Sequence, residues 1–212
     1  MRTLAIDCAT PACSIALFDD GVLVAHDHRV LGRGHAERLV PMIAGLPDRG
    51  RANRIIVSRG PGSFTGVRIG IATARALAYA WGAELRGYPT LALVAAMGRE
   101  RAGEVALTVC MTGGHGEWFV QGFDAAGKPT GERASLSPAD AVARYRGEPV
   151  VGDQADAFAH AAGPDKAVEA IDLFPDAAET LHLSPADLTC DAGALYGRPP
   201  DARPIAADST QQ

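Results

Sequence analysis

An acidic and a hydroxyl side chain follow the first apolar run of the chain, in the segment Asp7-Cys8-Ala9-Thr10. A carboxylate and turn amides that close a strand in this way can together hold a phosphate and its metal ion. The same residue types also satisfy the backbone groups of an ordinary turn. On this segment alone, the ordinary turn is the better interpretation.

A glycine-rich loop runs from Gly60 to Gly66, between an apolar run and a helical pattern, which is the usual setting for an anion site. No Lys-Ser or Lys-Thr pair follows its last glycine, so it is not a Walker loop. Its spacing does not fit GxGxxG either. The alternative is a tight strand-to-helix turn whose glycines adopt positive φ.

The spacing of histidines and cysteines argues against a metal site. On a helix, the second ligand to a metal held by His35 would fall four residues later, where the chain has Leu39. The cysteines, at positions 8, 13, 110 and 190, form no CxxC pair and are expected to be buried, reduced thiols. No Ser-His-Asp or Cys-His arrangement stands out, so the sequence predicts neither a catalytic site nor a metal site.

Small residues recur every four positions after the glycine-rich loop, at Gly66, Gly70, Ala74 and Ala78. On a helix they form one strip with minimal side chains, which allows a second element to approach closely. Glycine inside a helix costs roughly 1 kcal/mol relative to alanine, so the strip indicates a packing surface rather than a catalytic one. An internal helix and another protein chain are about equally good candidates for its partner.

The elements that position these motifs can be predicted from local patterns. Three short strands are expected around 4–6, 14–18 and 22–25, with a turn at 19–21 between the last two. A helix follows from about residue 34, with apolar residues at i, i+3, i+4 and i+7, and Pro41 should kink it or delay its start. A buried strand at 54–58 leads into the glycine-rich loop and a helix that ends near Gly82, with Ser63 or Thr65 as its N-cap.

The pattern changes after residue 100. Beyond a helix over 90–99, a strand pair is expected at 105–109 and 117–123, then a helix at 138–145 capped by Ser137 and a strand at 149–152. The pattern weakens from Gly163 onward, where short helices and a frayed tail beyond Pro204 are expected. We therefore predict two domains, 1–103 and a smaller 104–212.

Composition and charge limit the classes of function. The 212 residues are 47% hydrophobic and 21% charged, which is ordinary for a soluble globular chain. The net charge of −5 argues against a protein that holds nucleic acid alone by neutralising phosphates. The apolar run 67–81 is too short and too charged to span a membrane, and no signal peptide opens the chain, so a cytoplasmic location is expected.

The thirteen residues from Ser58 to Gly70, SRGPGSFTGVRIG, closely resemble the signature of the TsaB (YeaZ) family. This family supplies a subunit of the bacterial machinery that makes threonylcarbamoyladenosine in tRNA. Segments 4–10, 13–17 and 35–41 support the resemblance, which covers residues 1–100 strongly and the remainder loosely.

The resemblance implies an α/β fold of the actin-like ATPase (ribonuclease H-like) type, with two subdomains that each contain a mixed sheet flanked by helices. In that superfamily an Asp-x-Gly-Thr element binds phosphate, and here its third position is Ala9. Asp7 and Thr10 are therefore candidates for a vestigial phosphate site. The family implies no cofactor bound by this subunit, with weak nucleotide binding as the alternative.

The resemblance also implies a non-catalytic role. TsaD, the catalytic paralogue, carries His-x-x-x-His for its metal, whereas this chain has His35 and Leu39. The family binds and activates TsaD, is engaged by the ATPase TsaE, pairs with itself when alone and meets tRNA only through the complex. The alternative is an enzyme that acts alone, either an actin-fold ATPase or kinase or a glycoprotease-like protein.

The family pairs through its first two helices, which gives the small-residue strip and its neighbours a partner-binding role. The residues expected to contact the partner are His35, Arg38, Leu39, Ile43, Gly66, Arg68, Gly70, Ile71, Ala74 and Ala78. Residues 1–100 carry a balance of +4 and residues 101–212 a balance of −9. The arginine-bearing half is thus the half expected to meet the partner.

Overall fold

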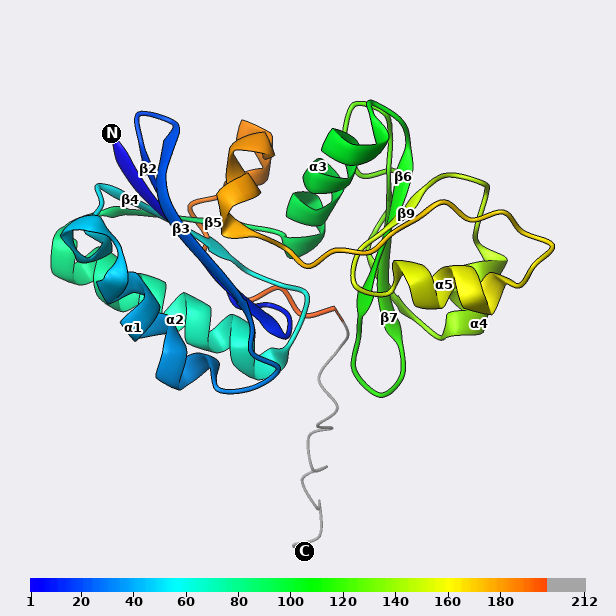
Figure 1. Ribbon diagram of the computed structural model, residues 1–212, viewed down its shortest axis with the longest axis horizontal. Coiled ribbons are helices and arrows are strands. Elements are labelled where there is room, and N and C mark those ends of the chain that lie inside the picture. The colour runs from blue at the N-terminus through cyan, green and yellow to red at the C-terminus, as the bar shows by residue number, and fades with distance from the viewer. Residues whose placement is uncertain (198–212) are drawn as a thin grey trace, which may run out of the picture.

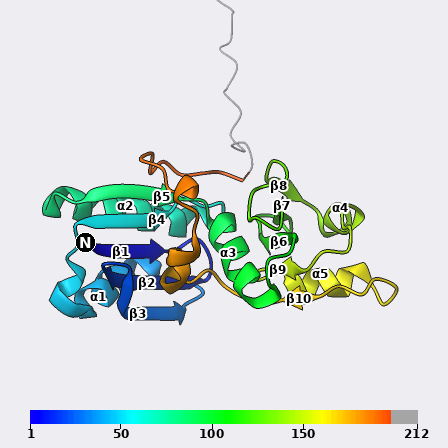
Figure 2. The same ribbon diagram turned by 90° about the horizontal axis from the view of Figure 1, so that it is seen from above.

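Two five-stranded sheets lie side by side in the computed structural model, which describes residues 1–197 (Figures 1 and 2). The first sheet has the order β3-β2-β1-β4-β5. Its strands are β1 (Arg2–Asp7), β2 (Ala12–Asp19), β3 (Val22–Val30), β4 (Arg54–Ser58) and β5 (Glu84–Tyr88). The first three form an antiparallel meander, and β4 and β5 continue the sheet in parallel with β1.

The second sheet has the order β10-β9-β6-β7-β8 and is also mixed. Its strands are β6 (Leu107–Thr112), β7 (Trp118–Phe123), β8 (Ala134–Leu136), β9 (Val150–Val151) and β10 (Ala170–Ile171). The predicted strands of both halves are confirmed, and so is the fold class. Strand β5 was not predicted, because its polar residues interrupt the apolar pattern that is typical of a buried strand. Glu84 on this strand forms ion pairs with Arg54 and Arg86.

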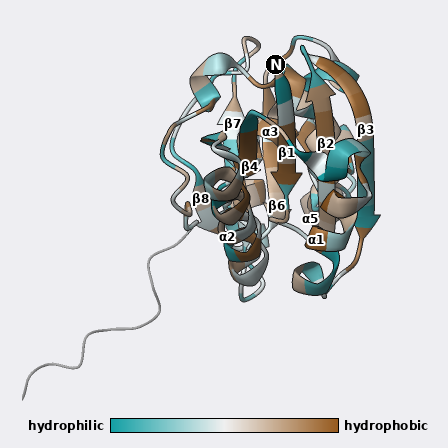
Figure 3. Cartoon of the chain, turned by 90° about the vertical axis from the view of Figure 1, so that its left-hand side faces the viewer, coloured by the Kyte–Doolittle hydropathy of each residue, from teal (hydrophilic) through white to brown (hydrophobic). Residues whose placement is uncertain are grey.

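Helices cover the sheets in layers. α1 (His35–Gly45) and α2 (Phe64–Trp81) lie side by side on the outer face of the first sheet (Figures 1 and 3). α3 (Thr90–Ala102) lies between the two sheets, and α4 (Pro138–Ala143) and α5 (Ala155–Ala162) cover the far face of the second. Short 3-10 helices occupy Pro47–Gly50, Ala177–His182 and Pro185–Asp187.

The alternation of side chains along β1 separates two hydrophobic cores. Leu4 and Ile6 pack with α1 and α2, whereas Ala5 points to the opposite face and packs with α3 and the inner face of the second sheet. A third core joins the second sheet to α4 and α5. Each sheet is thus covered on both faces, as mixed sheets with parallel strands require.

The local signals at helix ends are confirmed. The Ser63 side chain accepts a hydrogen bond from the Gly66 amide at 3.2 Å, and Gly82 ends α2 with φ of 64°. The Ser137 hydroxyl caps α4 in the same way. Helix α1 begins at His35 and contains Pro41, so the proline does not delay its start.

The chain returns to the first half after the second sheet. Asp176 accepts a hydrogen bond from the Ser14 hydroxyl at 3.3 Å, and the amide of Leu195 donates to the Arg59 carbonyl at 2.7 Å. The division after residue 103 stays a prediction, and the tail predicted beyond Pro204 lies outside the described residues. Within residues 1–197, no helix has both the length and the apolar character needed to cross a membrane.

Candidate functional site

The glycine-rich loop packs tightly against the turn after β1. A Cβ atom on Gly62 would overlap the backbone of Ala9, and one on Gly66 would overlap the carbonyl oxygen of Cys8. The Ser63 amide also donates to the Ala9 carbonyl at 2.7 Å. Gly62 and Gly66 are thus required for close backbone approach within the chain. Of the glycines in this loop, only Gly60 adopts the positive φ expected of a tight turn, at 87°.

The small-residue strip of α2 faces the chain's own sheet. Gly66, Gly70, Ala74 and Ala78 are all buried. The site of a Cβ on Gly70 lies 3.5 Å from the Cβ of Cys8 and 3.7 Å from Val57. The strip therefore packs against the chain's own first sheet. The two candidate partners considered from the sequence were an internal helix and another protein chain. The expectation that these four residues contact another protein is corrected, because the first sheet already covers them.

Four further members of the expected partner set are also interior. Leu39, Ile43 and Ile71 belong to the core beneath α1 and α2. His35 is buried, and its Nε2 lies 2.9 Å from the Thr10 carbonyl and 3.2 Å from the Ala12 carbonyl. Since both neighbours are acceptors, Nε2 carries the proton and donates, and the ring holds the turn after β1 in place.

A different set of residues forms the exposed surface of the two helices. We call it the outer helical face: Val40, Pro41, Ala44, Ala72, Ala76, Tyr79 and Ala80. Tyr79 is 93% exposed and Val40 is 55% exposed. Small residues spaced by four recur here too, at 72, 76 and 80, so the signal was present in the sequence. The spacing alone does not distinguish this face from the strip on the opposite side of α2, which has the same period of four.

Arg38 and Arg68 are the two members of the expected set that the structure leaves exposed. The Arg68 guanidinium lies over the Phe64 ring, 3.6 Å from its centroid, and donates to the Tyr196 hydroxyl at 3.0 Å. The two rings are 5.9 Å apart. Arg68 therefore joins the start of α2 to the returning segment, whereas Arg38 lies on α1.

A cleft of about 760 Å³ opens where this aromatic cluster lies between the two halves. One wall is the turn at 9–11 with the start of α2, and the other is the β6–β7 turn at 112–115 with Phe119 and Asp153. Residues 195–197 close one side. Its lining combines aromatic rings with a few polar groups, which is the usual composition of a ligand pocket.

The polar groups of the cleft are engaged with one another. Asp153 accepts from the Thr112 amide at 2.8 Å and from the Thr112 hydroxyl at 2.7 Å. Burial raises the pKa of Asp153 above its usual value, and these two hydrogen bonds oppose that rise. The Gln154 side chain in turn donates to the Thr112 hydroxyl at 2.8 Å. This set stabilises the turn that lines the cleft.

The two candidate phosphate-binding residues lie in different places. Thr10 lines the cleft, and its hydroxyl oxygen accepts from the Ala12 amide at 3.2 Å. Asp7 is not part of the lining; its carboxylate accepts from the Ala9 amide at 2.9 Å and from the Tyr88 hydroxyl at 3.1 Å. Burial raises the pKa of Asp7 to about 6. The structure therefore does not bring the two residues together as a phosphate site.

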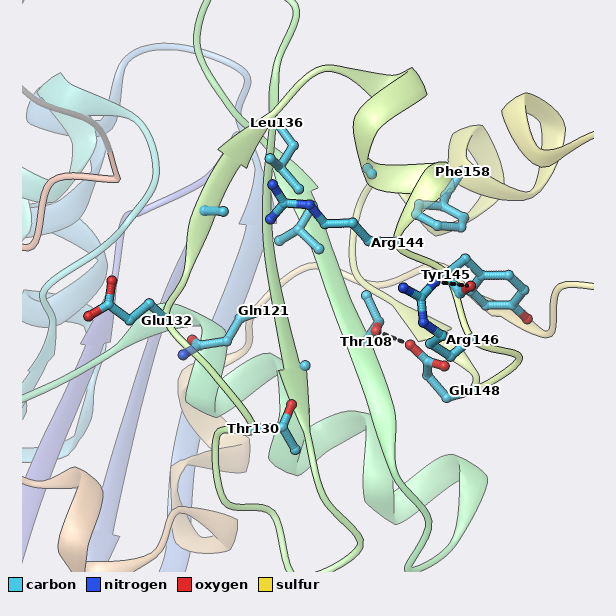
Figure 4. Close-up of a pocket in the computed structure, with 14 residues that line it drawn as sticks. Thr108, Gln121, Thr130, Glu132, Leu136, Arg144, Tyr145, Arg146, Glu148 and Phe158 are labelled. Atoms are coloured by element: carbon cyan, nitrogen blue, oxygen red, sulfur yellow. Dashed lines mark hydrogen bonds between the residues drawn. The ribbon is translucent and has the colours of Figure 1, made fainter.

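A second, smaller hollow of about 230 Å³ lies in the second half, between β7, β8 and α4 (Figure 4). The Thr108 hydroxyl donates to Glu148 at 2.6 Å, and Arg146 donates to the Tyr145 carbonyl at 3.0 Å. These polar side chains are occupied by contacts within the chain. Across the described part of the chain, residues 1–197, no three His, Cys, Asp or Glu side chains gather closely enough to hold a metal ion.

Residues 29–184 match the model of the family described as "TsaD: tRNA N6-adenosine threonylcarbamoyltransferase". A relative in Escherichia coli K12, the tRNA threonylcarbamoyladenosine biosynthesis protein TsaB, is 50% identical over 90 residues. That match covers 40% of this chain and only 38% of the relative's length.

An uncharacterised protein of Mycobacterium tuberculosis H37Rv matches over almost the whole chain. It is 32% identical over 217 residues, which cover 96% of this chain and 94% of that protein. Among solved structures, YeaZ from Pseudomonas aeruginosa superposes with a TM-score of 0.76 over 92% of this chain and 99% of that one. At 24% identity, this likeness establishes the shared two-sheet fold.

Proposed function

This chain belongs to the TsaB/YeaZ family, within the wider group matched by the TsaD family model, and from that premise we propose that it is a non-catalytic activating subunit. Its task is to bind a TsaD-type paralogue and support the transfer of a threonylcarbamoyl group to adenosine in tRNA. The complex works in the cytoplasm.

The outer helical face is the single observation that carries this proposal. Two adjacent helices expose apolar and small side chains, with Tyr79 almost fully accessible. Exposed apolar groups gathered in one place are characteristic of protein contacts, and tyrosine is enriched where binding energy concentrates. Arg38 lies on the same helix as Val40, so we propose a partner surface that is apolar with an acidic rim.

The environment of His35 supports a non-catalytic role. The catalytic paralogue's His-x-x-x-His corresponds here to His35 and Leu39, and Leu39 is completely buried in the core. The Nε2 of His35 is already committed to two backbone carbonyls. This position serves to hold the turn after β1, and we assign it no metal.

The cleft residues do not fit a nucleotide phosphate chain of the superfamily type. The Asp7 carboxylate is closed off by Tyr88, and the Ala9 carbonyl is covered by the glycine-rich loop. We therefore propose that this subunit has no resident cofactor. We assign any weak nucleotide binding to the aromatic cluster at the cleft.

Three further assignments follow from family membership. Alone, the chain pairs with a second copy through the same outer helical face, so the homodimer and the complex with the paralogue exclude each other. A TsaE-type ATPase engages the assembled pair. The chain's net charge of −5 agrees with tRNA being held mainly by the rest of the complex.

Reconstitution tests the proposed function directly. The purified chain, a TsaD-type paralogue, a TsaE-type ATPase, ATP, tRNA and threonylcarbamoyl-adenylate are combined, and modified adenosine is measured by mass spectrometry of tRNA digests. Modified tRNA should form only when both the chain and the paralogue are present. Equal yield without the chain would contradict an activating role.

The competing function is an enzyme that acts alone, an actin-fold ATPase or kinase or a glycoprotease-like protein. It is tested by ATP hydrolysis and peptide cleavage with the purified chain. We expect neither above the level of a mock purification. Robust turnover that co-purifies with the chain would replace the proposed function.

A further inference from the structure

Two buried cysteines face each other where the β1–β2 ladder ends. The ladder pairs Asp7 with Ser14, and the next position in the same antiparallel register sets Cys8 opposite Cys13. Their sulfur atoms are 3.6 Å apart, and both residues are almost completely buried. Neither residue has a role in the proposed function.

This placement suits a covalent bond between the two sulfurs. Directly opposed residues in an antiparallel ladder have Cα atoms about 4.5–5.5 Å apart. Disulfides are accommodated at Cα separations of roughly 4.4–6.8 Å. Closing the bond requires the two sulfur atoms, 3.6 Å apart, to approach to about 2.05 Å. We propose that Cys8 and Cys13 are a modification site, which a hydroperoxide converts reversibly into a cross-strand disulfide.

The reaction balances with hydrogen peroxide as the oxidant. The Cys13 thiolate attacks one peroxide oxygen, the O–O bond breaks, and Cys13 becomes a sulfenic acid while hydroxide leaves. The Cys8 sulfur then attacks the Cys13 sulfur, the S–O bond breaks, and the hydroxyl group leaves as water with the Cys8 proton. Two thiols and one peroxide give one disulfide and two waters, so the cysteines lose two electrons in total.

The surroundings separate the roles of the two cysteines. A hydrogen bond from the Cys8 thiol lowers the pKa of Cys13, and the same contact together with burial raises the pKa of Cys8. Cys13 is thus the residue that reacts first, and Cys8 resolves the sulfenic acid. Burial favours a small oxidant over glutathione disulfide or a second protein chain.

The bond would close the base of a turn that matters for the cleft. Thr10 and Pro11, within this turn, line the cleft, and His35 already holds the turn through the Thr10 and Ala12 carbonyls. On the other side, Cys8 lies against α2, where its Sγ is 3.8 Å from the site of a Cβ on Gly70. Oxidation therefore fixes a turn that contacts both the cleft and the helices above it.

Thiol mapping tests the proposal on the full-length folded chain carrying Cys190→Ser, which removes the exposed thiol. The chain is incubated with hydrogen peroxide, quenched with catalase, denatured, alkylated and digested with trypsin. Peptide 3–29 contains both Cys8 and Cys13 and no internal arginine or lysine. We expect this peptide to carry no alkyl group and to be lighter than the reduced, unalkylated peptide by two hydrogen atoms. After reduction and renewed alkylation, it should carry an alkyl group on both cysteines.

Cys110 is the matched control, because it is equally buried and lies alone in the second sheet. It should remain fully alkylated after the same treatment. In the variant that also carries Cys13→Ser, Cys8 should remain alkylated as well. The proposal is overturned if peptide 3–29 stays doubly alkylated, if its cysteines gain oxygen separately, or if Cys8 loses its label without Cys13.

Discussion

The two sides of α2 are built from the same residue types and have opposite roles. Its inner side presents Gly66, Gly70 and two alanines to the first sheet, where they are buried. Its outer side presents alanines at the same spacing of four, with Tyr79 among them, to the exterior. Small side chains inside permit close approach, whereas those outside leave a flat surface that another protein can cover.

The largest expected effect comes from the inner side. In Gly66→Ala, the added methyl group would overlap the carbonyl oxygen of Cys8, and backbone on both sides leaves little room for relief. We expect a loss of about 3 kcal/mol or more in the free energy of unfolding, measured by urea denaturation. A loss below about 1 kcal/mol would show that α2 does not approach the turn this closely.

The buried carboxyl of Asp7, on the opposite face of β1, gives a pH-dependent effect of similar size. Its pKa rises from 3.8 to about 6 on folding, so it binds its proton more readily in the folded chain. Its contribution to stability is present below pH 3.8 and is lost as pH rises through 6. As pH rises from 3.8 to about 6, the free energy of unfolding of Asp7→Asn should therefore increase by about 3 kcal/mol relative to that of the unmodified chain.

The Asp7 measurement compares urea unfolding of both proteins from pH 3.5 to about pH 7. Asparagine can still accept from the Ala9 amide and can donate to the Tyr88 oxygen, so the packing is preserved. Two stability curves that stay parallel over the whole range would contradict an Asp7 carboxyl with a raised pKa.

Gly70→Ala is the smallest of the inner effects and provides the control for Gly66. The new methyl group would meet its nearest neighbour at 3.5 Å, which is ordinary contact. Helix propensity then favours alanine, so we expect the free energy of unfolding, measured by urea denaturation, to increase by up to about 1 kcal/mol. A strongly destabilised Gly70→Ala variant would mean that the whole strip, and not only its first residue, is at the limit of close packing.

Sequence patterns predict the features of this fold that depend on near neighbours. The caps at Ser63 and Ser137 and the stop at Gly82 are recognisable because each acts on backbone groups within one turn. Which side of α2 faces inward is not a local property. Glycines and alanines recur by four at 66–78 and alanines at 72–80, and only the position of Cys8 and Val57 beneath the helix separates the two.

The same limit explains the errors in the candidate site. His35 carries a side chain that often binds metals or partners, yet its two acceptors come from a turn more than twenty residues earlier. The cleft could not be predicted, because it is assembled from the turn at 9–11, the turn at 112–115 and the returning residues 195–197. Such contacts follow from the packing of two sheets, which local spacing does not encode.

The central claim is that the outer helical face binds the paralogue, and one affinity comparison tests it. Binding of a TsaD-type paralogue is measured by titration calorimetry for Ala76→Glu, on that face, and for Ala157→Glu, an exposed alanine on α5 in the other half. Ala76→Glu should weaken binding at least about tenfold, which is about 1.4 kcal/mol, with Ala157→Glu unchanged. Equal affinities for the two variants would contradict the account.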